Sequence, residues 1–280
     1  MTRSTLVGAA LAAAALTTSA VAQQNAAPRA YNAAKAKLDR GEQIVGGTVT
    51  SADPDIYCAM ARSGFDFLWI EMQHSPLTYQ EVARMIWACR DAPAVPFIRV
   101  PDSTPGDIQK ATDIGALGII IPLVDSVEEI RSAVEYTMYP PQGKRSLGNG
   151  QYGALYGNTY RQTANDNMVI VAMIESPAGV ALADEIASVP GVDVVFAAST
   201  DLGSFSGMRQ GQPDYEAMVT TIHDATLEAG RKLGGPLAWR DRADFTFFQA
   251  PPESTFIRLG VEAALRAAPT GQAPIEGAER

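Results

Sequence analysis

Short, continuously apolar runs alternate with segments of helical spacing along most of this chain. Runs of this kind are typical of parallel strands that are buried on both faces of a sheet. Eight of them are predicted as strands: Ile44–Val49, Phe65–Ile70, Val95–Val100, Leu117–Ile121, Val169–Ile174, Val192–Ala197, Lys232–Leu237 and Thr255–Leu259. The alternation therefore predicts an α/β fold built on a parallel sheet.

The segments between these runs place apolar residues on one face of a helix. The clearest predicted helices are Ile56–Ala61, Tyr79–Cys89, Val127–Tyr136 and Tyr215–Ala229. The residues near their starts that can open or cap them are Pro54, Thr78, Ser126 and Asp214. Eight strand–helix units between residues 44 and 266 match the size of a single-domain (β/α)8 TIM barrel, the fold that we expect. A doubly wound open sheet is the alternative, but no Gly-x-Gly-x-x-Gly loop follows the first strand.

Residues 1–22 have the organisation of a cleavable signal peptide. Arg3 supplies a positive charge, Leu6–Leu16 is apolar, and Ala20-Val21-Ala22 offers the small residues of a cleavage site. The apolar stretch is too short to cross a bilayer, and an ordinary Ala-rich helix is the alternative. We therefore expect a periplasmic or secreted mature protein. Residues 23–43 are predicted as a linker or N-terminal helix, and residues 267–280 as a C-terminal tail.

The charge of the chain limits its partners. Its net charge is −9 and it has no basic run, which argues against nucleic acid and anionic membrane surfaces. No segment after the N-terminus is long and apolar enough to span a membrane. A metal cation remains compatible with this charge.

Two cysteines and one long connection leave questions open. Cys58 and Cys89 could pair in an oxidising compartment, but both lie in partly apolar helical segments, and we favour two buried free thiols. The segment Tyr139–Asn167 has little apolar period, and such long loops are usually lids or binding loops. Its tyrosines, Tyr152, Tyr156 and Tyr160, are candidates for a wall of the substrate site.

Polar side chains follow several predicted strands. Because the active site of a (β/α)8 barrel lies at the carboxyl ends of its strands, we expect these side chains to meet there. They are Glu71, His74, Arg99, Glu175 and Asp201. Glu175 and Asp201 are the natural ligands of an oxygen-preferring ion such as Mg²⁺ or Mn²⁺. Each of these two carboxylates could instead stabilise or cap the start of a helix.

The remaining polar residues suit proton transfer and anion binding. Histidine is the usual proton carrier among side chains, so His74 is the predicted acid–base residue, and Glu71 could orient its ring; a loop histidine satisfied by backbone is the alternative. Arg99 lies within an apolar run, where a charge needs a ligand or an ion pair, for instance with Glu71. His223 falls inside a helical stretch and is predicted to be structural or exposed.

The residues around these positions resemble the HpcH/HpaI aldolase family. In Gly64–His74 a strand ends in an acidic residue and a histidine follows three places on, as in that family. Further matching segments follow in the family's order: Phe97–Pro101, Gly115–Pro122, Tyr139–Arg145, Ala164–Asn167, Ile174-Glu175 and Gly191–Leu202.

The resemblance implies a (β/α)8 barrel, pyruvate as the enolate donor, and a divalent metal ion, Mg²⁺ or Mn²⁺ with Co²⁺ as a further candidate. Carried over by position, Glu175 and Asp201 are the metal ligands, His74 is the general base with Glu71 as its partner, and Arg99 binds the substrate. Ser199 and Thr200 fall where the family's backbone holds the substrate carboxylate. The resemblance also implies a homo-oligomer, a trimer or hexamer, with helices exchanged between barrels.

Some positions depart from the family pattern. Glu71 replaces the usual Asp, Gln73 the usual Glu, and Met173 the usual Gln, while Ala198-Ser199-Thr200-Asp201 replaces Gly-Pro-x-Asp. We expect a metal-dependent aldolase acting on 4-hydroxy-2-keto acids, with a 2-keto acid and an aldehyde as its small-molecule partners. The alternatives are an exported, non-catalytic barrel that binds keto acids, and a lyase of the citrate lyase β or malyl-CoA type. Lys144-Arg145 is the one basic pair suited to the phosphates of CoA.

Overall fold

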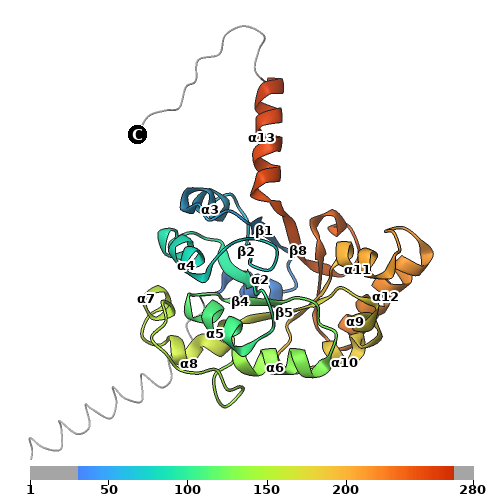
Figure 1. The fold of residues 1–280 in the computed structure, drawn as a ribbon, viewed down its shortest axis with the longest axis horizontal. Coiled ribbons are helices and arrows are strands. Elements are labelled where there is room, and N and C mark those ends of the chain that lie inside the picture. Colours follow the sequence, from blue (N-terminus) through green and yellow to red (C-terminus); the bar gives the residue numbers. More distant parts are fainter. Residues whose placement is uncertain (1–30, 268–280) are drawn as a thin grey trace, which may run out of the picture. The chain divides into compact units, whose positions relative to one another are not determined.

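The computed structural model describes residues 31–267, which form a closed barrel of eight parallel strands in sequence order (Figure 1). The strands are β1 (Ile44–Val49), β2 (Phe67–Glu71), β3 (Val95–Arg99), β4 (Gly118–Ile121), β5 (Val169–Ile174), β6 (Val194–Ala197), β7 (Lys232–Pro236) and β8 (Phe245–Pro252). The barrel closes where β1 pairs with β8, for example Gly46 with Gln249. The predicted signal peptide, the start of the predicted linker and the predicted tail beyond Ala267 lie outside the described residues.

Seven of the eight predicted strands are confirmed, with ends that shift by no more than two residues. The eighth prediction, Thr255–Leu259, is wrong, because these residues belong to helix α13 (Glu253–Ala267). The strand that closes the barrel is the preceding segment, β8. The aromatic residues of β8 are buried, whereas Ile257 and Leu259 are 54% and 45% exposed. An apolar run alone therefore did not reveal which of two neighbouring segments is buried.

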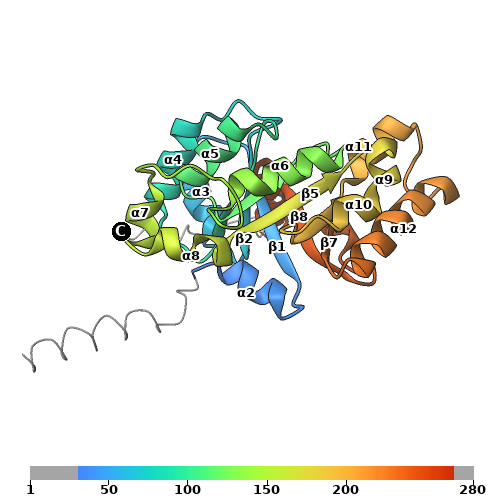
Figure 2. The ribbon, with the colours of Figure 1, turned by 90° about the horizontal axis from the view of Figure 1, so that it is seen from below.

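Helices surround the barrel (Figures 1 and 2). Between α2 (Ala33–Asp39) and α13 they are α3 (Pro54–Ala61), α4 (Tyr79–Ala88), α5 (Pro105–Asp113), α6 (Val127–Thr137), α7 (Tyr152–Tyr156), α8 (Tyr160–Asn167), α9 (Pro177–Ala181), α10 (Ala183–Ala187), α11 (Ser199–Ser206) and α12 (Pro213–Glu228), with a short 3-10 turn, η1 (Leu237–Trp239). Thr78 and Ser126 cap α4 and α6 as predicted, each accepting a backbone N–H of the first turn. Asp214 lies inside the first turn of α12, which begins at Pro213.

Aromatic rings fill the barrel interior. The ring of Phe67 lies 4.6 Å from that of Phe97 and 4.7 Å from that of Phe247, measured between centroids. The neighbouring strands make room with glycine, since a Cβ at Gly46 or Gly118 would overlap the ring of Phe67 or Phe97. This packing closes the axis of the barrel, so that polar groups at the carboxyl ends of the strands open only outward.

Helix α2 covers the opposite, amino-terminal end of the barrel (Figure 2). Lys37 forms a 2.6 Å ion pair with Asp66, just before β2, and Lys35 lies 3.6 Å from Asp193, just before β6. The Asn32 side chain caps α2 and donates to the carbonyl oxygen of Leu117. These contacts hold α2 across the strand starts, and α2 lies in the second half of the segment 23–43.

The expectation of two free thiols is wrong. Cys58 of α3 and Cys89, which follows α4, form a disulfide with a Cα–Cα distance of 5.5 Å. Helices α3 and α4 pack side by side outside the barrel, and this brings together two residues that are 31 positions apart in sequence. Cys89 is buried as expected and Cys58 is partly buried, but their helical settings carried no information on the distance between the helices.

The prediction that the Tyr139–Asn167 segment forms a wall of the substrate site is wrong for the pocket of the same chain. It connects α6 to β5, so it lies at the amino-terminal end of the barrel, where Tyr156 donates to the carbonyl oxygen of Gly115. Arg145 anchors it from a fully buried position. The contacts of the Arg145 guanidinium are a 2.9 Å hydrogen bond to Tyr160, a 3.2 Å ion pair with Asp113, and the ring faces of Tyr139 and Tyr152.

No helix within residues 31–267 is long and apolar enough to cross a membrane.

Candidate active site

A polar pocket of about 120 Å³ opens at the carboxyl ends of strands β3 and β5 to β8. Five of the predicted site residues, Arg99, Glu175, Ser199, Thr200 and Asp201, line it together. Its other lining residues are Met173, Phe196, Ala198, Pro236 and Gln249. The pocket therefore combines a cation, two carboxylates and two hydroxyl side chains over the aromatic interior.

Glu175 is the most deeply buried charged group of the pocket, with 1% of its surface exposed. Its Oε1 accepts the backbone N–H of Leu123 at 2.8 Å, while Oε2 is buried and has no hydrogen-bond partner among residues 31–267. The pKa of Glu175 is raised to about 7, mainly because the carboxylate is buried; the neighbouring Asp201 adds to the rise, whereas Arg99 and the Leu123 N–H oppose it. Glu175 thus presents to the pocket a buried carboxylate oxygen that no other group within residues 31–267 contacts by a hydrogen bond.

Leu123 holds Glu175 from an unusual backbone conformation. Its φ is +49°, a left-handed value that is uncommon for a residue with a branched, bulky side chain. Non-glycine residues with such angles concentrate at functional sites, where the surroundings enforce them. The loop after β4 therefore takes part in shaping the pocket, although sequence reasoning did not single out Leu123.

Arg99 is buried at the end of β3 and is held by two side chains from β2 and the loop after it. Its Nη1 lies 3.4 Å from Glu71 Oε2, and its Nη2 donates to the side-chain oxygen of Gln73. Its Nε is buried without a partner in the described part of the chain. The predicted ion pair with Glu71 is thus confirmed, and Gln73 is a contact that sequence reasoning missed.

Glu71 and His74 are not arranged as predicted. The Glu71 carboxylate accepts the indole N–H of Trp69 at 3.1 Å and the backbone N–H groups of Gln73 and His74 at 2.9 and 3.0 Å. The His74 side chain is exposed and does not line the pocket. Glu71 therefore holds the backbone at His74, and the structure does not bring its carboxylate to the imidazole ring.

Ser199, Thr200 and Asp201 form the first turn of α11. The hydroxyl of Tyr215, from α12, donates to the carbonyl oxygen of Ser199 at 2.9 Å and fixes this turn. The N-cap residue, Ala198, has no side chain that could accept the first N–H groups of the helix. These N–H groups and the helix dipole favour an anion at this edge of the pocket.

Gln249 was also missed. It lies on β8, and its Nε2 lies 3.3 Å from the hydroxyl oxygen of Thr48. A glutamine between aromatic and apolar residues can be recognised in the sequence as a candidate site residue. Because the eighth strand was predicted ten residues too late, Gln249 was not considered as part of a strand.

Glu175 and Asp201 are the two acidic side chains that line the pocket. Among the described residues, no group of three or more His, Cys, Asp or Glu side chains is placed to hold a metal ion. Two carboxylates leave the remaining positions of an ion to water and substrate, as Mg²⁺ usually requires. These two carboxylates, with a Glu175 Oε2 that has no hydrogen-bond partner in the described part of the chain, fit an oxygen-preferring divalent cation.

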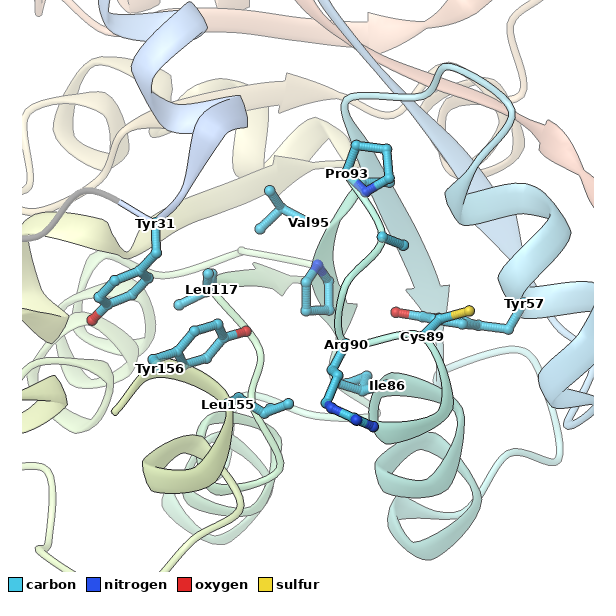
Figure 3. A pocket seen from close by; sticks show the side chains of 13 residues that line it. Tyr31, Tyr57, Ile86, Cys89, Arg90, Pro93, Val95, Leu117, Leu155 and Tyr156 are labelled. Carbon is cyan, nitrogen blue, oxygen red and sulfur yellow. The ribbon is translucent and has the colours of Figure 1, made fainter. Parts of the chain in front are cut away.

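A second pocket, of about 90 Å³, lies elsewhere, between α4, α7 and the starts of β3 and β4 (Figure 3). Tyr31, Leu117 and Tyr156 line one side of it, and Tyr57 and Cys89 the other (Figure 3). It sits at the amino-terminal end of the barrel and is remote from the carboxylates. It is not the candidate active site.

Residues 48–266 match the family described as HpcH/HpaI aldolase/citrate lyase. The chain belongs to this family. HpcH/HpaI membership agrees with the closed parallel barrel and with a polar site at its carboxyl end. It makes the chain an aldolase, an enzyme that breaks or forms carbon–carbon bonds.

Relatives within the HpcH/HpaI family carry aldolase names. A hydroxypyruvate/pyruvate aldolase of Rhizorhabdus wittichii is 37% identical over 180 residues, which cover 63% of this chain and 72% of that protein. Another hydroxypyruvate/pyruvate aldolase, of Sagittula stellata, is 32% identical over 84% of this chain and 93% of its own. A solved HpcH/HpaI aldolase/citrate lyase family protein of Burkholderia cenocepacia matches with a TM-score of 0.77 at 27% identity, covering 84% of this chain and 98% of that one.

Proposed function

We propose that this aldolase cleaves 4-hydroxy-2-keto acids to pyruvate or hydroxypyruvate and an aldehyde, and forms them in the reverse direction, with a divalent metal ion at Glu175 and Asp201. The observation that carries the proposal is the convergence of Arg99, both carboxylates and the start of α11 on one pocket. The relatives named as hydroxypyruvate/pyruvate aldolases support this choice of enolate donor.

The metal ion follows from the chemistry of the donors and from the family, whose members are typically metal-dependent. Glu175 and Asp201 would hold Mg²⁺, Mn²⁺ or Co²⁺. When bound, the ion supplies positive charge that stabilises an enolate oxygen. The buried Glu175 Oε2, which has no hydrogen-bond partner within residues 31–267, supports this assignment, because a buried carboxylate oxygen normally has a partner.

Backbone and side-chain groups of the pocket bind the substrate and stabilise its developing charge. The N–H groups of Ser199 and Thr200 hold the substrate carboxylate at the start of α11. The Arg99 guanidinium, which Glu71 and Gln73 keep in place, stabilises the negative charge that develops on the C2 oxygen. Because these donors are fixed before the substrate arrives, little reorganisation accompanies the reaction.

The proton transfers are assigned to His74. In the cleavage direction its neutral imidazole takes the proton of the C4 hydroxyl group, the C3–C4 bond breaks, and its electron pair passes into the enolate as the aldehyde forms. Protonation of C3 then yields the 2-keto acid. The ring is exposed in the structure, but its backbone is held at the end of β2 by Glu71, and catalytic contacts often tighten only with substrate bound.

Of the two alternatives, the CoA-dependent lyase is not supported by Lys144 and Arg145, the basic pair considered for the phosphates of CoA. Arg145 is buried among tyrosines and Lys144 contacts Glu135, both at the end of the barrel away from the pocket. A non-catalytic keto-acid-binding barrel is the second candidate, motivated by Gln73, Met173 and the Ala198–Asp201 segment.

The deciding experiment measures release of pyruvate and hydroxypyruvate from a panel of 4-hydroxy-2-keto acids by the mature protein. Parallel reactions contain EDTA, or EDTA followed by excess Mg²⁺, Mn²⁺ or Co²⁺. Release that EDTA stops and a metal restores is the expected outcome. Binding of a keto acid by folded protein without turnover under any condition would favour the binding barrel.

We also infer that the chain forms a homo-oligomer, a trimer or hexamer. Helix α13 supports this, because Ile257, Val261 and Leu265 are 54%, 53% and 73% exposed, and the helix projects away from the barrel (Figure 1). Such apolar side chains are normally covered by a partner. Light scattering on the wild type and on Val261→Asp/Leu265→Asp tests this inference, and a monomeric wild type contradicts it.

Export to the periplasm or medium is a further proposal. The Cys58–Cys89 disulfide supports it, since disulfides persist mainly in oxidising compartments. N-terminal sequencing of protein recovered from periplasm and medium should show cleavage after Ala22. An intact N-terminus on cytoplasmic protein would contradict export.

A further inference from the structure

We propose that the Cys58–Cys89 disulfide is a site of reversible modification by small thiols, in which Cys58 receives the thiol and Cys89 leaves as a thiolate beside Arg62. The reactant is a low-molecular-weight thiol, of the class of free cysteine or glutathione. The inference goes beyond the aldolase function and does not depend on it, because the disulfide joins two outer helices and does not line the active-site pocket.

The two cysteines differ in exposure. Cys89, which follows α4, is 5% exposed, whereas Cys58 of α3 is only partly buried. Thiol–disulfide exchange requires the attacking thiolate to reach one of the two sulfur atoms, and the other sulfur is then the leaving group. A thiol in the solvent therefore reaches Cys58 more readily, and Cys89 is the sulfur that leaves.

Arg62 places a positive charge at the buried sulfur. Its Nη1 donates to Cys89 Sγ at 2.9 Å. Arg62 stands four residues after Cys58, at the end of α3, and its backbone N–H donates to the Cys58 carbonyl oxygen at 3.2 Å. Its side chain therefore reaches from the helix of one cysteine to the sulfur atom of the other.

This contact favours the opened form of the bond. A guanidinium gains little from a neutral disulfide sulfur and much more from a thiolate. Cys89 ends α4, where the helix dipole disfavours a negative charge. Arg90 does not compensate for the dipole, because its guanidinium lies over the ring of Trp87, 4.9 Å from the centroid. Arg62 is therefore the cation that stabilises the leaving sulfur.

The exchange needs no oxidant or reductant other than the thiol itself. A thiolate RS⁻ attacks Cys58 Sγ, the bond to Cys89 Sγ breaks, and its electron pair stays on Cys89 as a thiolate. The product is a mixed disulfide between Cys58 and the small thiol. Attack of the Cys89 thiolate on Cys58 Sγ expels RS⁻ and restores the original bond.

Backbone contacts keep the two sulfur atoms close to each other after the bond opens. The N–H of Ala94, just before β3, donates to the carbonyl oxygen of Ala61 at the end of α3 at 3.4 Å, and α3 packs against α4. These contacts do not involve the sulfur atoms. Cys89 therefore stays beside Arg62 and can attack Cys58 again, so the modification is reversible.

The test follows the oxidised mature protein in excess glutathione, with samples quenched in iodoacetamide at successive times and mapped by peptide mass spectrometry. The expected early product has glutathione on Cys58 and the alkyl group on Cys89. Arg62→Ala should form it about three- to tenfold more slowly, because the leaving thiolate loses its counter-charge. Arg62→Lys keeps the charge and should recover most of the rate.

Arg90→Ala is the matched control, because it removes an exposed arginine next to Cys89 whose guanidinium contacts Trp87 instead of the sulfur. It should react at the rate of the wild type. Thermal unfolding of each oxidised variant verifies that it folds. Glutathione mainly on Cys89, an unchanged rate in Arg62→Ala, or a wild-type disulfide that does not exchange would each overturn the proposal.

Discussion

The guanidinium of Arg99 lies 3.4 Å from the carboxylate of Glu71, and both side chains are less than one-tenth exposed. A buried charge that loses its partner is costly, so Glu71→Gln should lower the free energy of unfolding by about 3 kcal/mol. It should also raise KM for the keto acid, because Arg99 loses one of the two groups that orient it. Urea unfolding and steady-state kinetics measure the two effects. Glu71→Asp keeps the charge and should lose less, and unchanged stability in Glu71→Gln would contradict the importance of the pair.

Glu175→Gln and Asp201→Asn should each weaken metal binding by at least about a hundredfold, since each removes a proposed ligand. Titration calorimetry with Mn²⁺ measures affinity, and release of the keto acid measures turnover. Ser199→Ala, which keeps both carboxylates, is the control and should bind Mn²⁺ normally. Full metal-dependent activity in either carboxylate variant would refute the assignment.

His74→Ala should lower kcat by a factor of about 10² to 10⁴, the usual contribution of a general acid–base group. The chain has a second histidine, His223 on α12, which contacts Asp244 before the start of β8 and does not line the pocket, so it provides the control. His223→Ala should leave kcat unchanged. Comparable activity in the two variants would remove His74 from the mechanism.

The double variant Cys58→Ser/Cys89→Ser should be about 3 kcal/mol less stable than the oxidised wild type, because the disulfide restricts the unfolded chain. Reduction of the wild type should produce the same loss. Since the disulfide joins outer helices, kcat/KM should not change. Urea unfolding with and without reductant checks the prediction, and equal midpoints would show that the bond does not stabilise the fold.

Stability should depend weakly on pH through His223. Burial lowers the pKa of His223, but hydrogen bonds to Asp224 and Asp244 outweigh burial and raise it above 6.5. The folded protein therefore binds this proton more tightly, and the stabilisation is fully present below pH 6.5 and is lost as pH rises through the folded pKa. For a partly exposed group the effect is about 0.5 kcal/mol. His223→Gln should be less stable than the wild type at about pH 5.5 and equal to it at about pH 9; a difference of equal size at both would contradict this.

The sequence predicted the barrel correctly because alternating periodicity is a local property. Continuous apolar runs and caps such as Thr78 and Ser126 are visible without knowledge of distant contacts. The long segment from Tyr139 to Asn167 was assigned to the wrong end of the barrel because its composition was considered and its order along the chain was not. Its composition indicated a binding loop, but its place between a helix and the next strand puts it at the amino-terminal end of any parallel barrel.

The chain by itself thus determined the fold class, seven strands, the family and the residues that end the strands, since each depends on local pattern or on order along the chain. The tertiary structure alone decided which apolar segment closes the barrel, that Cys58 meets Cys89, and that Glu71 and Gln73 hold Arg99. It also placed Gln249 in the pocket and the backbone N–H of Leu123 against the Glu175 carboxylate. These depend on burial and on distances between residues far apart in sequence, which periodicity and composition do not encode.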